Sequence, residues 1–139
     1  MMLLLHTSSV RARLGLADHD QLIAQDTFLI DRQLAEKLAE RIPQFLQATH
    51  CTLPALTHIV VHSGPGGFTG LRIGVTTANA LAYALGIPVV GISGLVKDLT
   101  VLLDRSRTEH PSIGSIAIPV YARPPDIGPV PGSEVREAF

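Results

Sequence analysis

Residues 63–74 have the sequence SGPGGFTGLRIG, which predicts a glycine-rich turn between an apolar strand and a helix. Its closely spaced glycines allow backbone angles that other residues avoid, its proline fixes one φ angle, and its threonine can cap the following helix. Such a turn lets a strand and a helix approach each other closely. We therefore predict a structural turn made by Gly64, Pro65, Gly66, Gly67 and Thr69.

A phosphate site is the alternative use of this turn. Free N–H groups at a helix N-terminus can hold an anion, so a small nucleotide-binding enzyme, ATPase or kinase-like, could use Gly64–Gly67 as a phosphate cradle. However, the turn lacks the Lys-Ser/Thr pair of a P-loop, and its glycines do not have the spacing of the dinucleotide-binding motif. These two differences favour the structural interpretation.

The hydrophobic pattern on both sides of the turn predicts an α/β fold. Alternating or continuous apolar residues predict strands, and apolar residues three or four apart predict helices. Strands are expected over residues 3–5, 10–16, 22–28, 59–61 and 89–92, and helices over 31–48, 69–85 and after 93, while 113–121 could form a last strand. This order suits an RNase H-like or actin-like half, in which a mixed five-stranded sheet (an antiparallel meander, then parallel strands) is covered by helices. Residues 1–122 are predicted to form one such domain, and the proline-rich residues 123–139 an extended or disordered tail.

Single residues predict where the helices begin, bend and end. Asp31 is a plausible N-cap of the first helix, and Pro43 is expected to kink or loosen it. Gly86 should end the second helix. Leu95 has the spacing of the third helix, which is predicted to begin after Ser93.

The composition excludes several classes of protein. Hydrophobic residues make up 46% of the chain, which is enough for a buried core, and the formal net charge is −1, so any contact with RNA is expected to be made through a partner. The single cysteine, Cys51, forms no internal disulfide, and the chain is expected in the cytoplasm. No charged residue lies between Arg72 and Lys97, but Gly86 and Pro88 interrupt this stretch, so no membrane segment is expected.

The sequence assigns no catalytic residue, no metal site and no cofactor. His58 and His62 have the four-residue spacing of a metallopeptidase ligand pair on a helix, but on a strand they would lie about 13 Å apart and could not share one metal. No base is placed by sequence near the candidate nucleophiles Ser8, Ser9 and Ser63. A metallopeptidase-like relative is therefore the least favoured alternative.

Two histidines are expected to meet if the first and fourth strands are neighbours. His6 and His62 would then lie together at one edge of the sheet, as a pH-sensitive pair or a weak metal site. The preferred interpretation is two partly exposed histidines at strand ends.

The second predicted helix carries a stripe of small residues. Gly70, Gly74 and Ala78 recur every four residues, so another backbone can approach this stripe closely. The stripe is either core or an interface. Arg72 lies in the first turn, where the helix dipole does not favour a cation, so it either contacts a partner or faces solvent.

Several segments together resemble the TsaB family, also called YeaZ. They are LLLHTSSVRARLGLAD at 3–18, DRQLAEKLAERIPQFL at 31–46, SGPGGFTGLRIG at 63–74, TTANALAYALGIPVVGISGL at 76–95 and IPVYARPP at 118–125. The resemblance implies half of an actin-like ATPase fold that has lost catalysis. This chain departs from the family at His6, where the family has Asp, and at Gly67, where the family usually has Ser. The second lobe that family members carry before the tail is expected to be missing.

The resemblance also implies a function in tRNA modification. A member of this family is not itself the enzyme but pairs with a TsaD-type catalytic subunit, and it supports threonylcarbamoyl transfer to the adenosine beside the anticodon. A TsaE-type ATPase could join a larger complex, tRNA is contacted only through the complex, and a homodimer is expected when the chain is alone. In the family, the first two helices of each partner pack together. The implied interface residues are Leu34, Leu38, Ile42, Gly70, Arg72, Gly74 and Ala78.

Overall fold

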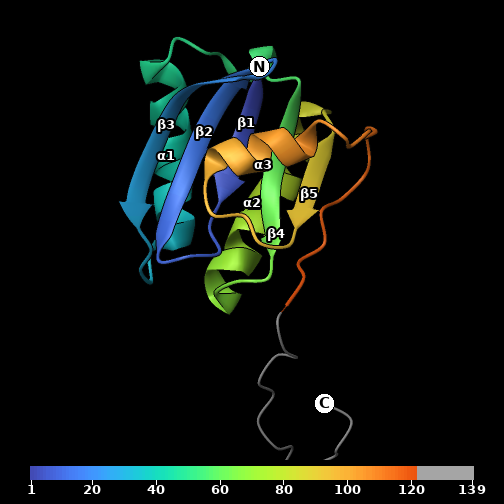
Figure 1. Cartoon of the computed structure of the whole chain (residues 1–139). Coiled ribbons are helices and arrows are strands. Elements are labelled where there is room, and N and C mark those ends of the chain that lie inside the picture. The colour runs from blue at the N-terminus through green and yellow to red at the C-terminus, as the bar shows by residue number, and fades with distance from the viewer. Residues whose placement is uncertain (122–139) are drawn as a thin grey trace, which may run out of the picture.

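A five-stranded mixed sheet lies at the centre of the fold in the computed structural model, which describes residues 1–121 (Figure 1). The strands are β1 (Met2–His6), β2 (Arg11–Asp18), β3 (Gln21–Leu29), β4 (His58–Gly64) and β5 (Val89–Ser93). Their order across the sheet is β3-β2-β1-β4-β5. The predicted tail, residues 123–139, lies outside the described residues.

The pairing of the strands confirms the predicted fold class. β1 and β2 are antiparallel, with Leu5 opposite Leu14, and β2 and β3 are also antiparallel. β4 then runs parallel to β1, with Leu5 opposite Val61, and β5 runs parallel to β4. An antiparallel meander that continues into parallel strands is the RNase H-like arrangement that the sequence predicts.

Three α-helices cover the two faces of the sheet, and a short 3-10 turn, η1 (Leu53–Ala55), precedes β4. α1 (Leu34–Ala48) and α2 (Phe68–Leu85) pack against the face that carries Leu3 and Leu5, whereas α3 (Leu99–Ser106) packs against the face that carries Leu4 (Figure 1). Successive side chains of a strand point to opposite faces, so the continuous apolar run of β1 supplies both layers of core. None of the helices within residues 1–121 is long and apolar enough to cross a membrane.

The first helix differs from the prediction at its start and at its proline. It begins at Leu34 with Gln33 as N-cap, so the prediction that Asp31 caps it is wrong. Asp31 instead accepts a hydrogen bond from the Gln33 N–H at 2.8 Å and pairs with Lys37 at 2.5 Å. The helix continues through Pro43, since Ile42 and the apolar residues after the proline are buried and hold both halves against the sheet.

The third helix begins later than predicted. Its N-cap is Asp98, whose carboxylate accepts a hydrogen bond from the Val101 N–H at 2.9 Å. Gly94, with a φ of 102°, turns the chain before it, and Leu95 lies outside the helix and is 92% exposed. The sequence predicts an earlier start because Leu95 has the spacing of the apolar residues of this helix.

The predicted strand at 113–121 does not form. The side-chain amide of Asn79 holds this segment instead, because it donates to the Ala117 carbonyl at 2.9 Å and accepts from the Ala117 N–H at 2.8 Å. Further along, the Val120 N–H donates to the Ser63 carbonyl at 2.6 Å. A side chain of α2 therefore makes the backbone hydrogen bonds that a neighbouring strand would otherwise make.

Candidate functional site

The glycine turn joins the end of β4 directly to α2. Gly64 has a φ of 108°, which is a backbone angle that side chains other than glycine rarely adopt. Gly67 is the N-cap of α2, and no side chain caps the helix, so the prediction that Thr69 is the cap is wrong. Thr69 lies inside the first turn of α2 and is exposed.

Close contacts with other segments of the chain explain two of the glycines of this turn. A Cβ atom at Gly66 would overlap the side chain of Ser8, and one at Gly64 would overlap the Val120 carbonyl. The Gly67 N–H donates to the Ser8 carbonyl at 2.9 Å, so it is already occupied. The turn thus packs tightly against the chain itself, which is what a structural turn requires.

The stripe of small residues on α2 faces the interior. A Cβ atom at Gly70 would overlap the Thr7 carbonyl, and one at Gly74 would overlap the Thr7 hydroxyl. That hydroxyl donates to the Gly70 carbonyl at 2.7 Å, and Ala78 is fully buried. Of the two interpretations of the stripe, the structure therefore supports packing within this chain.

Six of the seven residues named as partner contacts are buried. Leu34, Leu38 and Ile42 face the core beneath α1, as Gly70, Gly74 and Ala78 do beneath α2. Arg72 is exposed, and its guanidinium lies 5.4 Å from the centre of the Phe68 ring. Helical spacing identified the apolar face of each helix correctly, but an apolar face in the sequence does not tell whether the sheet or a partner covers it.

The outer surface of α2 carries residues that the sequence analysis did not select. Tyr83 is 91% exposed, and Phe68 is 38% exposed beside Arg72. α1 and α2 contact each other on the same face of the sheet, so their outer sides form one surface (Figure 1). The sequence does contain a signal for this surface. Aromatic residues lie on the outer side of a helix that has only one charged residue, Arg72.

His6 and His62 form a buried stacked pair where β1 and β4 end. Their ring centres lie 4.6 Å apart with an angle of 13° between the planes. The expectation that the two residues meet is confirmed, but both side chains are only 2% exposed, so the preferred interpretation of partly exposed histidines is wrong. The chain between β5 and α3 buries them, since Nε2–H of His62 donates to the Gly94 carbonyl and Nε2–H of His6 to the Val96 carbonyl, both at 2.7 Å.

Ser8 completes this cluster of polar side chains. With its Nε2–H donated to a carbonyl, His62 is the tautomer whose Nδ1 is an acceptor, and the Ser8 hydroxyl donates to it. The Nδ1 atom of His6 is buried and has no hydrogen-bond partner among the described residues. Burial lowers the pKa of both histidines, and the pKa of His6 is lowered further by His62 and Arg13, that of His62 by Arg105. The sequence could not reveal the pairing of Ser8 with His62, because the partners are 54 residues apart.

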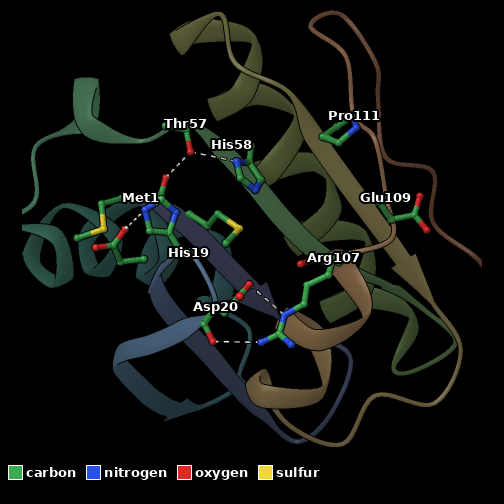
Figure 2. Close-up of a pocket in the computed structure, with 11 residues that line it drawn as sticks. Met1, His19, Asp20, Thr57, His58, Arg107, Glu109 and Pro111 are labelled. Carbon is green, nitrogen blue, oxygen red and sulfur yellow. Dashed lines mark hydrogen bonds and ion pairs between the residues drawn. The ribbon is translucent and has the colours of Figure 1, made fainter.

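A cavity of about 680 Å³ lies at the opposite end of β1 and β4 (Figure 2). Its lining charges are mostly paired with one another: Arg107 lies 3.3 Å from Asp20 and 3.1 Å from Asp104, and the imidazole of His58 is hydrogen-bonded to the Thr57 hydroxyl at 3.0 Å. No group of three metal-ligating side chains forms within residues 1–121. His58 lines this cavity while His62 lies at the far end of the same strand, so the two do not share a site, as their strand spacing predicts.

Comparisons with known proteins point to one family. The family model described as "TsaD: tRNA N6-adenosine threonylcarbamoyltransferase" matches residues 28–115. The TsaB protein of tRNA threonylcarbamoyladenosine biosynthesis from Bacillus subtilis is 32% identical over 93 residues, which cover 67% of this chain and 41% of that protein. An uncharacterized protein of Mycobacterium tuberculosis is 36% identical over 99 residues, which cover 66% of this chain and 47% of that protein.

A solved structure agrees with the sequence relatives. YeaZ from Pseudomonas aeruginosa superposes with a TM-score of 0.62 at 31% identity, over 68% of this chain and 44% of that one. The matched region thus covers less than half the length of each of these three relatives.

Proposed function

Since the chain belongs to the family of TsaD, the tRNA N6-adenosine threonylcarbamoyltransferase, and within it is TsaB-like, we propose that it is an accessory subunit of threonylcarbamoyladenosine synthesis on tRNA. It binds a TsaD-type catalytic subunit and supports transfer of the threonylcarbamoyl group without catalysing that transfer. With a net charge of −1, it contacts tRNA only through the complex.

One observation carries this proposal. The matched region of the TsaB and YeaZ relatives, 31–32% identical, is about two thirds of this chain, and the family match at 28–115 includes all of α1 and α2. The helices that the family uses for pairing are therefore present, although the matched region covers less than half of each relative. A second lobe is not required for these two helices to pack on the sheet.

The outer surface of α1 and α2 is the proposed docking surface. Aromatic residues and arginine supply much of the binding energy at protein interfaces, and Phe68, Arg72 and Tyr83 are the exposed residues of that kind on α2. Of the residues named from the sequence, only Arg72 contacts the partner in this proposal. The other six hold the helices in place on the sheet.

The same surface also serves the proposed homodimer. Without its partner, the chain forms a homodimer through α1 and α2, and this contact covers the same exposed aromatic side chains. A TsaE-type ATPase joins the larger complex through the catalytic subunit. The proposal places this protein in the cytoplasm, where tRNA is modified.

Co-purification tests the proposed pairing. A tagged full chain is co-expressed with the catalytic subunit of the same organism, and a stoichiometric complex is expected on size exclusion. Formation of the modified nucleoside by the catalytic subunit should rise when the chain is added, whereas the chain alone produces none. If a folded catalytic subunit does not bind the chain at micromolar concentrations, the proposal fails. Calorimetry with ATP and Mg²⁺ tests the alternative of a nucleotide-binding enzyme, which predicts binding to the isolated chain.

A further inference from the structure

We propose that Ser8 is a nucleophile toward small activated acyl esters, with His62 as its base. This reactivity goes beyond the accessory role and does not depend on it. The pair lies beside α2 at the carboxyl edge of the parallel strands β1 and β4, away from the cavity and from the outer side of α1 and α2.

The tautomer of His62 gives it the properties of a base. Its Nε2–H is fixed on the Gly94 carbonyl at 2.7 Å, which leaves the Nδ1 lone pair for the Ser8 proton. A nucleophile that is hydrogen-bonded to a base, with that base oriented by a third group, is the arrangement of hydrolytic dyads and triads. Here the third group is a backbone carbonyl.

The surroundings keep His62 neutral and ready to accept a proton. The charged and titratable groups around it are His6 from β1 and Arg105 from α3, and neither stabilises an imidazolium. Burial has the largest effect and lowers the pKa of His62 below its usual value of 6.5. At neutral pH the base is therefore unprotonated and available.

Helix α2 provides a favourable field for the negative charge that develops during attack. Its first turn lies against the Thr7–Ser8 segment, where the Gly67 N–H donates to the Ser8 carbonyl and Gly70 approaches the Thr7 carbonyl. The N–H groups of the first helical turn have no acceptors within the helix. The positive end of an 18-residue helix thus faces the segment that carries the nucleophile.

We propose a substrate with a small acyl group because Ser8 is largely buried. Ser8 is 8% exposed, and a Cβ atom at Gly66 would already overlap its side chain. The acetyl group of an acetyl ester with a good leaving group is among the smallest acyl groups and is therefore the one proposed. In the reaction, Ser8 Oγ bonds to the carbonyl carbon, the bond from that carbon to the leaving oxygen breaks, and the Oγ proton passes through His62 Nδ1 to the leaving group. The product is an ester on Ser8.

p-Nitrophenyl acetate tests this proposal on the full chain. We expect release of one equivalent of p-nitrophenol per chain, and peptide mass mapping should place one acetyl group on Ser8. Ser8→Ala should abolish the modification, and His62→Gln should slow it by about 100-fold, the usual lower range for a general base. The matched control is Ser9→Ala, because Ser9 is exposed and its hydroxyl donates a hydrogen bond to the Arg11 carbonyl and not to a histidine. It should react as the original chain does.

Two further measurements separate reactivity from a structural role. The acetylation rate of the original chain should fall as the pH drops and His62 is protonated, whereas a serine that only supports the fold gives no such profile. If His62→Gln fails to fold, a Ser8→Cys variant replaces it, and its thiol should react with iodoacetamide faster than Cys51 does. Acetylation that is absent from Ser8, or equally fast in a folded His62→Gln chain, overturns the proposal. The pull-down with the catalytic subunit does not depend on either result.

Discussion

The imidazole rings of His6 and His62 stack with their centres 4.6 Å apart, although they belong to different strands. The parallel pairing of β1 with β4 puts them side by side, and hydrogen bonds to Gly94 and Val96 hold the chain between β5 and α3 over them. The pair therefore joins the sheet edge to the start of the α3 layer. Because both imidazole rings are buried, the stability of the fold should depend on pH.

The free energy of unfolding should fall as the pH drops from 7 to 5. Burial lowers the pKa of His6, His62 and His58 below 6.5 in the folded chain, and the N-terminal ammonium also lowers that of His58. Below pH 6.5 the unfolded chain thus binds more protons than the folded chain, so stability is complete above 6.5 and is lost as the pH falls toward the folded pKa values. Urea midpoints at several pH values measure this.

The variants His6→Gln and His62→Gln should each flatten this pH dependence. Glutamine retains an N–H donor for the carbonyl but does not titrate. His19→Gln, the same substitution at an exposed turn residue, is the control for the change of side chain itself. An unaltered slope in both buried variants would show that the stacked pair does not titrate with unfolding.

Gly74→Ala should destabilise the fold by about 1–3 kcal/mol, the usual cost of overpacking. The new methyl group would overlap the Thr7 hydroxyl, which cannot move freely because it is bonded to the Gly70 carbonyl. Ala80→Leu is the matched control on the exposed side of the same helix and should change the thermal midpoint little. A double variant with Thr7→Ala should recover part of the loss. If Gly74→Ala is as stable as the original chain, the close packing described here is wrong.

Asn79→Ala should release the segment that contains Ala117. Both amide hydrogen bonds to the Ala117 backbone would be lost, at about 1 kcal/mol of net stability for each. Hydrogen exchange at Ala117 should accelerate, while exchange in β1 stays slow. Thr76→Ala, an exposed change one turn earlier, serves as the control. Unchanged protection of Ala117 in the Asn79 variant would contradict the anchoring role.

Tyr83→Ala and Arg72→Glu should each weaken binding to the catalytic subunit by about tenfold or more, as truncation of an aromatic or arginine anchor does at an interface. Both side chains are exposed on α2, so neither change should lower the thermal midpoint much. Lys97→Glu reverses a charge on the exposed chain before α3 and is the control. Equal binding by all three variants would move the proposed surface away from α2.

The sequence was sufficient for most of the architecture. Periodicity located all five strands, and Gly86, with a φ of 66°, ends α2 where its sequence predicts. Periodicity was less reliable where contacts in the tertiary structure overrode the local pattern. Leu95 has helical spacing but is exposed, and residues 113–121 have the apolar content of a strand but are held by Asn79.

The sequence by itself thus determined the order of strands and helices, the tight turn at 64–67 and the apolar face of each helix, because these depend on neighbouring residues. Only the tertiary structure decided what covers those faces. It placed Gly74 against Thr7 rather than against a partner, and it joined Ser8 to His62 across 54 residues. Hydrophobic spacing requires that a face be buried but does not specify its neighbour, which depends on which strands pair and where each loop returns to the sheet.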